Sequence, residues 1–208
     1  MTHCEVAIID YGMGNLRSVA NAFASFDCSI NVTQNPEDLY QASHIVLPGV
    51  GAFGDGMENL EVRGWIEVLE QEIREKGKPF LGICLGMQLL ATIGTEYGLH
   101  QGLNWIPGKV NRLEVHDDSI RVPHIGWNDV NFVKKDCLYQ NLSESQVFYF
   151  VHSYVFHVED EGVISGLTAY GSDFVASLEK DNIYATQFHP EKSQNAGIEV
   201  LKNFVKLT

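Results

Sequence analysis

Four segments in the first half of the chain have the pattern of β-strands, and the first of them is typical of a buried strand. They are Val6–Ile9, Ser29–Thr33, His44–Leu47 and Phe80–Ile83. Between them, apolar residues recur every three or four positions, which predicts two amphipathic helices. The two apolar stripes consist of Leu16, Val19, Ala20 and Phe23, and of Trp65, Ile66, Leu69 and Ile73. Strands that alternate with helices in short units are typical of a parallel sheet with helices on both faces.

The second half of the chain has a different pattern, with many β-prone segments and few helical ones from about residue 106 to residue 188. Val147–Val151 is one such segment. Phe174–Leu178 and Ile183–Phe188 are separated by four polar residues and predict a hairpin. A last stripe of Ile198, Leu201 and Val205 predicts a closing helix. Together the two halves predict an α/β fold with an open, largely parallel but mixed sheet flanked by helices.

Composition narrows the class of protein. The 208 residues contain neither an internal repeat nor a linker, so we expect one domain spanning residues 1–208. The formal net charge of −13 argues against nucleic acid as the main partner, because phosphate binding needs a cationic surface. The sequence contains no apolar run of about 18 residues, so we expect no membrane-spanning helix. Met1–Val6 also lacks the cationic and apolar regions of a signal peptide.

The four cysteines are Cys4, Cys28, Cys84 and Cys137, and they lie far apart without a C-x-x-C pair. That spacing predicts neither a zinc site nor a disulfide framework. We therefore expect free thiols, a reducing cytoplasm, and no metal or organic cofactor. Except for Cys84, we expect these cysteines to be small buried apolar residues.

Cys84 lies in the pentapeptide Gly82–Gly86, between an apolar strand pattern and a helix-forming segment, Met87–Ala91. Strand, glycine-flanked turn and helix is the context in which G-x-S-x-G presents a nucleophile above an α/β sheet. The glycines fit because a strained turn leaves little room for a Cβ atom. Here the nucleophile is a thiol, which forms an acyl-thioester intermediate.

A thiol needs a base, and His189 is the best candidate because it directly follows a predicted strand. Strand ends in an open parallel sheet share one edge, so Cys84 and His189 can meet although they are distant in sequence. Glu191 lies two residues further on, where an extended backbone points both side chains the same way. Its carboxylate can then orient the imidazole. A Cys, His or Glu taken alone more often has a structural role than a catalytic one, but the three together in these contexts favour a catalytic site.

Pro48–Gly51 ends another predicted strand at the same edge. Its glycines, Gly51 above all, allow a backbone N–H to turn toward an oxyanion, and the N–H of Leu85 follows the nucleophile directly. A plain turn is the alternative interpretation of Pro-Gly. At this stage a cysteine peptidase, another hydrolase and an amidotransferase all remain possible.

The motifs around these residues resemble the class I (triad) glutamine amidotransferases, a family with a flavodoxin-like fold. Cys84 lies in Gly-Ile-Cys-Leu-Gly-Met-Gln, and His189 and Glu191 lie in His-Pro-Glu. Further segments resemble the glutaminase subunits of imidazole glycerol phosphate synthases, which serve histidine biosynthesis. They are Ile9–Ser18, Pro48–Phe53, Pro123–Asn128 and Tyr149–Tyr154. Residues 95–104 and 131–146 carry no recognisable motif.

The resemblance implies hydrolysis of L-glutamine to glutamate and ammonia by Cys84, His189 and Glu191. It implies that the substrate is held by Gly49, Gln88 and the backbone of His152, Ser153 and Tyr154. It also implies a partner, a (βα)8-barrel cyclase subunit that uses the ammonia to make imidazole glycerol phosphate and aminoimidazole carboxamide ribotide.

A chain of this length without eight βα repeats cannot contain that barrel, so the resemblance implies a heterodimer of two separate proteins. By similarity, the candidate interface residues are Trp127, Tyr149 and Lys192. Because Lys192 adjoins Glu191, we expect partner binding to organise the Pro48–Gly51 loop.

Three alternatives stay open on sequence. The same chemistry could serve anthranilate or nucleotide synthesis, which the Gly-Met-Gly-Asn-Leu and Pro-His-Ile-Gly-Trp-Asn stretches disfavour. A cysteine peptidase or hydrolase would leave the partner motifs unexplained. A non-catalytic interaction subunit would not need the intact set of Cys84, His189 and Glu191.

Overall fold

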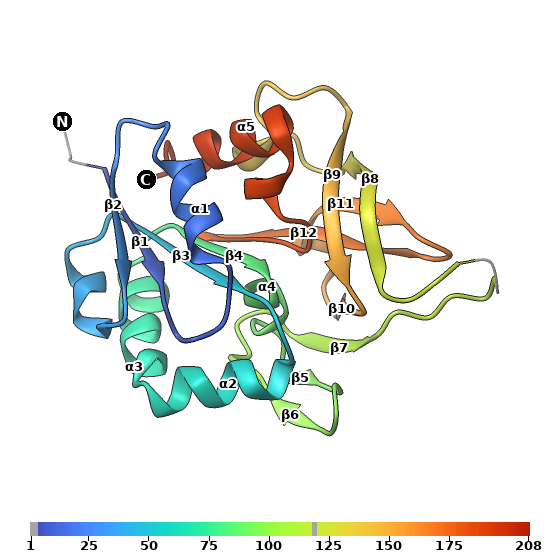
Figure 1. Cartoon of the computed structure of the whole chain (residues 1–208), viewed down its shortest axis with the longest axis horizontal. Helices are drawn as coiled ribbons and strands as arrows, with labels where there is room; N and C mark the ends of the chain where they lie inside the picture. Colours follow the sequence, from blue (N-terminus) through green and yellow to red (C-terminus); the bar gives the residue numbers. More distant parts are fainter. Residues whose placement is uncertain (1–3, 118–119) are drawn as a thin grey trace.

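A computed structural model describes residues 4–117 and 120–208, and a nine-stranded sheet forms its centre (Figure 1). Five neighbouring strands are parallel: β2 (Ser29–Thr33), β1 (Glu5–Ile9), β3 (His44–Gly49), β4 (Phe80–Cys84) and β13 (Ile183–Thr186). Four antiparallel strands extend the sheet: β12 (Asp173–Lys180), β11 (Ile164–Ala169), β8 (His124–Phe132) and β9 (Ser145–His152). The predicted mixed, largely parallel α/β sheet is therefore confirmed.

A second, smaller sheet lies beside the carboxyl-terminal end of β4. It consists of β10 (Tyr154–Val158), β7 (Gly108–Arg112), β5 (Ile93–Gly94) and β6 (His100–Gln101). Only Ser153 separates β9 of the large sheet from β10 of the small one. The chain thus changes sheets at the place where the residues after β4 emerge.

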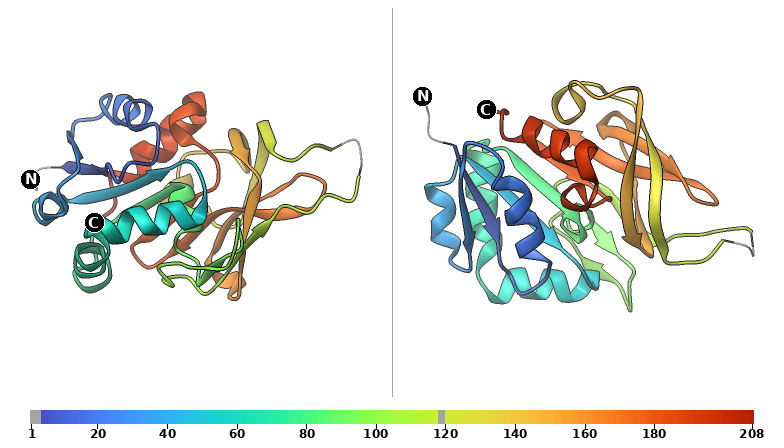
Figure 2. Two further views of the ribbon diagram at one scale, coloured as in Figure 1. Left: turned by 60° about the horizontal axis from the view of Figure 1, so that its bottom comes forward. Right: turned by 45° about the horizontal axis from the view of Figure 1, so that its top comes forward.

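Helices cover both faces of the parallel strands (Figures 1 and 2). α1 (Leu16–Phe23) and α5 (Gln194–Phe204) lie on one face, and α2 (Phe53–Val62) and α3 (Trp65–Leu69) lie on the other, with α3 continuing into a π-helical turn, Glu70–Glu75. Side chains of β1 alternate between the two faces. Val6 and Ile8 pack with α1 and α5, whereas Ala7 and Ile9 pack with α2 and α3. Burial on both faces explains the continuous apolar run of this strand.

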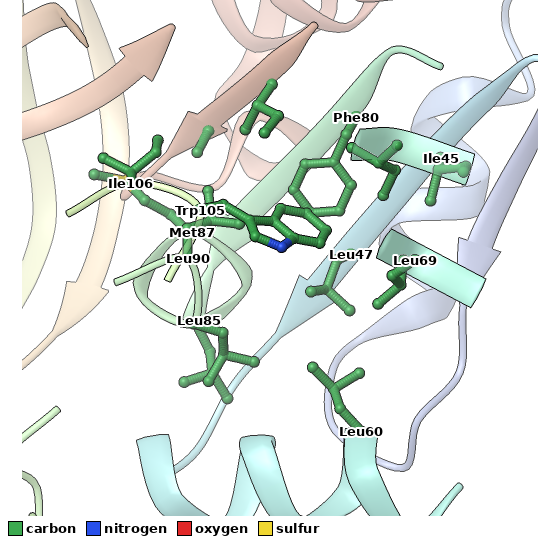
Figure 3. Packing of buried hydrophobic residues seen from close by; sticks show 14 of the residues in the cluster. Ile45, Leu47, Leu60, Leu69, Phe80, Leu85, Met87, Leu90, Trp105 and Ile106 are labelled. Carbon is green, nitrogen blue, oxygen red and sulfur yellow. The ribbon is translucent and has the colours of Figure 1, made fainter. Parts of the chain in front are cut away.

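The core under α2 and α3 also holds the segment that follows Cys84 (Figure 3). The rings of Phe80 and Trp105 meet edge to face at 5.4 Å. Leu85, Met87 and Leu90 are buried in the same cluster. The turn after β4 is therefore fixed by apolar packing on a rigid strand.

Most predicted elements are confirmed, but two helices differ from expectation. α2 was not predicted, because its sequence contains Gly54 and Gly56 and lacks a regular apolar stripe. The helix expected over Met87–Ala91 is only one turn, α4 (Leu85–Gln88). The carbonyls of Leu89, Leu90 and Ala91 accept hydrogen bonds from the backbone of residues 103–106 instead of continuing the helix.

The predicted hairpin is present, with β12 reaching Lys180 and a two-residue turn at Asp181 and Asn182. The closing helix α5 is present as well, but its buried face differs from the predicted stripe. Val200, Leu201 and Phe204 are buried, whereas Ile198 and Val205 are only partly buried.

The expectation of four free thiols is wrong, because Cys4 and Cys28 form a disulfide. They directly precede β1 and β2, which pair in parallel with Glu5 opposite Ser29, so their Cα atoms are 4.7 Å apart. Strand pairing brings them together, so their separation of 24 residues gave no signal. The inference of a reducing compartment loses this support. Cys137 is free but partly exposed, not fully buried.

In the two described ranges, no helix is long and apolar enough to span a bilayer. The signal-peptide prediction concerns Met1–Val6, of which Met1, Thr2 and His3 lie outside the described residues.

Candidate active site

Cys84 occupies a strained turn between β4 and α4. Its backbone has φ 54° and ψ −104°, a combination that residues other than glycine rarely adopt. A Cβ atom on Gly82 would lie 2.7 Å from the carbonyl oxygen of Gly86, and one on Gly86 would lie 1.9 Å from that of Leu47. Both positions therefore require glycine, and the predicted strand, glycine-flanked turn and helix are confirmed.

His189 lies close enough to Cys84 to interact with its charge, because β13 lies next to β4. The two strands are parallel, with Thr186 opposite Ile83, so their carboxyl ends share one edge of the sheet. His189 Nδ1 donates a hydrogen bond of 2.8 Å to Glu191 Oε1, and both side chains are buried. This contact fixes the orientation of the ring and leaves its second nitrogen, Nε2, available for proton transfer. Nε2 has no hydrogen-bond partner within residues 4–117 and 120–208.

The environment of His189 favours the imidazolium form. Burial lowers its pKa, but the negative charges of Cys84 and Glu191 outweigh burial and raise the pKa to about 10. At neutral pH the ring therefore carries a proton that it can transfer. A thiolate beside an imidazolium is the reactive form of a cysteine nucleophile.

The thiol opens into a pocket of about 360 Å³. Six of the residues predicted for the oxyanion hole or the substrate line it: Gly51, Leu85, Gln88, His152, Ser153 and Tyr154. Gly49 does not line the pocket, although it pairs in register with Cys84. The lining also includes Val50, Ala52 and Val151, which lie within the predicted motifs but were not among the predicted site residues. Glu96 and Tyr97 line it too, and no motif in the sequence signalled them.

The loop after β3 is shaped by close contacts behind it. A Cβ atom on Gly49 would lie 2.1 Å from the hydroxyl of Tyr11, and Gly51 has a φ of 110°. Both glycines thus permit conformations that a larger residue would prevent. The loop lies beside Cys84 because Gly49 pairs with it across β3 and β4.

Gln88 has a fixed side-chain amide. Its Nε2 donates to the carbonyl oxygen of Tyr154 at 3.0 Å and to Gln187 Oε1 at 2.9 Å. A carbonyl oxygen can only accept, so the nitrogen must face Tyr154. The Oε1 atom of Gln88 remains as an acceptor in the wall of the pocket.

Glu96 adds a carboxylate to the same pocket. It lies between β5 and β6, and its Oε2 accepts a hydrogen bond of 2.9 Å from the backbone N–H of Phe53 at the start of α2. Burial raises the pKa of Glu96, while this hydrogen bond opposes the change. The segment around Glu96 carries no motif, and only the fold brings it to the pocket.

Trp127, Tyr149 and Lys192, the predicted interface residues, form a cluster outside the pocket. Trp127 and Tyr149 are direct neighbours on β8 and β9, and their rings meet edge to face at 5.8 Å. Lys192 Nζ lies 5.8 Å from the ring centre of Tyr149. We call these three residues the aromatic patch. Trp127 is 48% exposed, so the patch is open to solvent.

Over the described residues, no group of three or more His, Cys, Asp or Glu side chains could hold a metal ion. The groups that the structure brings together here are the Cys84 thiol, the His189 imidazole, the side-chain amide of Gln88 and the carboxylate of Glu96.

Comparison with known proteins identifies the family. The family model described as "Glutamine amidotransferase class-I" matches residues 7–207. The Geobacter sulfurreducens protein named imidazole glycerol phosphate synthase subunit HisH is 50% identical over 204 residues, covering 96% of this chain and 97% of that one. The Campylobacter jejuni (strain 81-176) protein named imidazole glycerol phosphate synthase subunit HisH 1 is 48% identical over 202 residues, covering 97% and 100%.

Solved structures share the fold at much lower identity. A crystal structure of a glutamine amidotransferase has a TM-score of 0.73 at 18% identity, covering 97% of each chain. The structure of PurLQS from Thermotoga maritima has a TM-score of 0.72 at 19% identity, covering 98% of each chain.

Proposed function

The chain belongs to the class I glutamine amidotransferase family, and from that premise we propose that it is the glutaminase subunit of an imidazole glycerol phosphate synthase. The observation that carries the proposal is the buried set of Cys84, His189 and Glu191 at one edge of the sheet, with the thiol opening into a pocket. The chain is 45 to 50% identical in sequence to proteins named as HisH subunits, which favours this synthase over others.

The first half of the reaction follows from the charges of the site. The Cys84 thiolate attacks the side-chain carbonyl carbon of L-glutamine, and the backbone N–H groups of Gly51 and Leu85 stabilise the oxyanion. His189 then donates the proton at Nε2 to the amide nitrogen as the carbon–nitrogen bond breaks. The products of this step are ammonia and a γ-glutamyl thioester on Cys84.

The second half uses the same residues in reverse. Neutral His189 takes a proton from water, and the resulting hydroxide attacks the thioester carbon. The Cys84 thiolate leaves, glutamate is released, and His189 is again an imidazolium. Glu191 keeps the ring oriented and its charge balanced in both halves.

The polar groups of the pocket fit an amino acid. The carboxylate of Glu96 is suited to the α-ammonium group of glutamine, and the Oε1 atom of Gln88 supplies a further acceptor. His152, Ser153 and Tyr154, whose backbone the resemblance assigns to substrate binding, also line the pocket. We include Glu96 and Tyr97 among the substrate-binding residues for this reason.

Ammonia that escaped to water would be protonated, so the product needs a protected route to its consumer. We propose that the consumer is a separate (βα)8-barrel cyclase subunit that binds at the aromatic patch. An exposed cluster of Trp, Tyr and Lys beside the catalytic residues suits such a contact, because aromatic residues are enriched at interface hot spots. Partner binding would also organise the Pro48–Gly51 loop, since Lys192 adjoins Glu191.

The decisive experiment measures glutamine hydrolysis by the wild type and by Cys84→Ala, each alone and mixed with the cyclase subunit and its ligand. We expect the wild type to be stimulated by the partner and Cys84→Ala to be inactive. Full activity of Cys84→Ala would refute the mechanism. Equal wild-type rates with and without the partner and its ligand would refute the coupling, and faster turnover of asparagine would refute the substrate.

A further inference from the structure

Gln187 is a buried residue that contacts the reacting sulfur and has no role in the mechanism above. It directly follows β13, two residues before His189, and its side chain is fully buried. Its Nε2 atom lies 3.6 Å from Cys84 Sγ in hydrogen-bonding geometry. We propose that Gln187 is a catalytic residue whose side-chain amide donates a hydrogen bond to the Cys84 thiolate and holds the sulfur for attack. This rests on the proposed function of Cys84 as nucleophile.

The orientation of the Gln187 amide is determined by its neighbours. The carbonyl oxygen of Tyr154 can only accept a hydrogen bond. The side-chain group of Gln88 that faces this oxygen is therefore its NH₂ group. That same NH₂ group contacts the Gln187 amide at 2.9 Å, so the atom of Gln187 that it faces must be the oxygen. The NH₂ of Gln187 therefore faces the sulfur. A reversed amide would put two NH₂ groups in contact.

The contact with the sulfur gains strength when the thiol ionises. A hydrogen bond to a charged acceptor is roughly twice as strong as one between neutral groups. The carbonyl oxygen of Val151 lies 3.9 Å from the sulfur and has the opposite effect, because it can accept from the thiol but repels a thiolate. Gln187 thus offsets the effect of the Val151 carbonyl, which favours the neutral thiol.

The titratable side chains His189 and Tyr11 interact with Cys84 directly, and His152, Glu96, Tyr97 and Tyr154 line the same pocket. His189 lies after β13, and Tyr11 lies after β1 with its hydroxyl against Gly49. His152, at the end of β9, interacts with His189 and remains neutral because burial lowers its pKa to about 3. The amide of Gln187 does not titrate, so it donates to the sulfur at every pH at which the protein is folded.

The test measures thiol reactivity without glutamine. In the full-length Cys137→Ser protein, Cys84 is the remaining free thiol of the described residues. Iodoacetamide then reports on its thiolate, because the sulfur displaces iodide and forms a thioether. We expect Gln187→Met, which keeps the length but loses the donor, to lower the alkylation rate at pH 6.5 about ten-fold. The rate at pH 9.5 should change less, because thiols in general are largely ionised at that pH with or without a hydrogen-bond donor.

Two further variants separate this role from packing. Gln187→Glu has nearly the same shape but presents an oxygen to the sulfur, so the loss at pH 6.5 should exceed that of Gln187→Met. Asn203→Leu removes another buried carboxamide, one that bonds the carbonyls of Leu138 and Gln140 away from the thiol. It should destabilise the protein and leave the ratio of the two alkylation rates unchanged. A wild-type ratio in folded Gln187→Met overturns the proposal.

A measurement on the protein without a substitution at Gln187 covers the case in which the variants do not fold. The side-chain NH₂ resonances of Gln187 should shift in the pH range in which Cys84 alkylation becomes fast, and should not do so in Cys84→Ala. Resonances that do not respond overturn the proposal. Neither the alkylation assay nor the NMR measurement uses glutamine, so the result of each is independent of whether glutamine is the substrate.

Discussion

The backbone N–H of His189 donates a hydrogen bond of 2.9 Å to the carbonyl oxygen of Tyr149. Ser193 reinforces this link, because its hydroxyl donates to the carbonyl of His189 and accepts from the N–H of Tyr149. The main chain beneath the aromatic patch is thus tied to the main chain of the catalytic histidine. A partner that moves β9 at Tyr149 would move His189 with it.

Replacing the indole of the aromatic patch should weaken partner binding. We expect Trp127→Ala to raise the dissociation constant for the cyclase subunit at least about ten-fold, because a half-exposed Trp at an interface is typical of a hot spot. Titration calorimetry measures the change. Val62→Ala, an exposed residue of α2, is the control and should bind normally. Unchanged affinity of Trp127→Ala would place the partner elsewhere.

The charge on His189 should depend on Cys84. In Cys84→Ala the thiolate is gone, and burial, which lowers the pKa of the ring, has more influence. Its pKa should therefore fall below the wild-type value of about 10, as followed by NMR of the ring protons. The same pKa in both proteins would show that Glu191 alone controls the ring.

The raised pKa of His189 also predicts how stability depends on pH. The folded pKa of about 10 exceeds the ordinary value of 6.5, so the contribution is fully present below about pH 6.5 and is lost as the pH rises toward 10. Urea unfolding of the wild type should show a falling free energy over this interval. The fall should be smaller in Glu191→Gln, which removes one of the two negative neighbours.

Glu96 should act on substrate binding more than on chemistry. Glu96→Gln can still accept the hydrogen bond from Phe53 but loses its charge, so KM for glutamine should rise about ten-fold with a smaller change in kcat. Because burial raises the pKa of Glu96, the wild-type KM should begin to rise on acidification at a higher pH than an ordinary carboxylate would give. Steady-state kinetics between pH 5 and 8 tests both points. A lower kcat at constant KM would contradict this role.

The glycine after the nucleophile should be essential for folding. Gly86→Ala would bring a Cβ atom to 1.9 Å from the carbonyl oxygen of Leu47, which is backbone and cannot rotate away. We expect a loss of at least about 3 kcal/mol in unfolding free energy, measured by urea denaturation. Gly162→Ala meets only the side chain of Asp160 and should be tolerated. Wild-type stability of Gly86→Ala would mean that the elbow can shift.

Reduction of the disulfide should cost stability without changing catalysis. Closing a loop of about 25 residues stabilises a protein by roughly 3 kcal/mol in the chain-entropy model, so a reductant should lower the unfolding free energy by up to that amount. The bond lies at the amino ends of β1 and β2, whereas Cys84 lies at the carboxyl end of β4. Glutaminase activity should therefore persist, and Cys4→Ser should be insensitive to the reductant. Thiol titration that finds both cysteines free would refute the bond.

The sequence by itself determined the alternation of strands and helices, the strained turn at Cys84 and the pairing of His189 with Glu191. These features depend on local causes: apolar periodicity, glycines where a Cβ atom cannot fit, and a spacing of two residues in extended backbone. The motifs around Tyr11, Trp127 and Tyr149 also pointed to the correct family, because they are short and contiguous.

Only the tertiary structure decided which residues from distant parts of the sequence contact the catalytic residues and one another. Glu96 reaches the pocket because a short hairpin folds over the start of α2, and Gln187 contacts the thiol because β13 lies beside β4. Cys4 bonds Cys28 for a similar reason, the register of β1 and β2. Such contacts depend on which strands become neighbours. That order results from burying the whole sheet at once, so no local stretch of the chain records it.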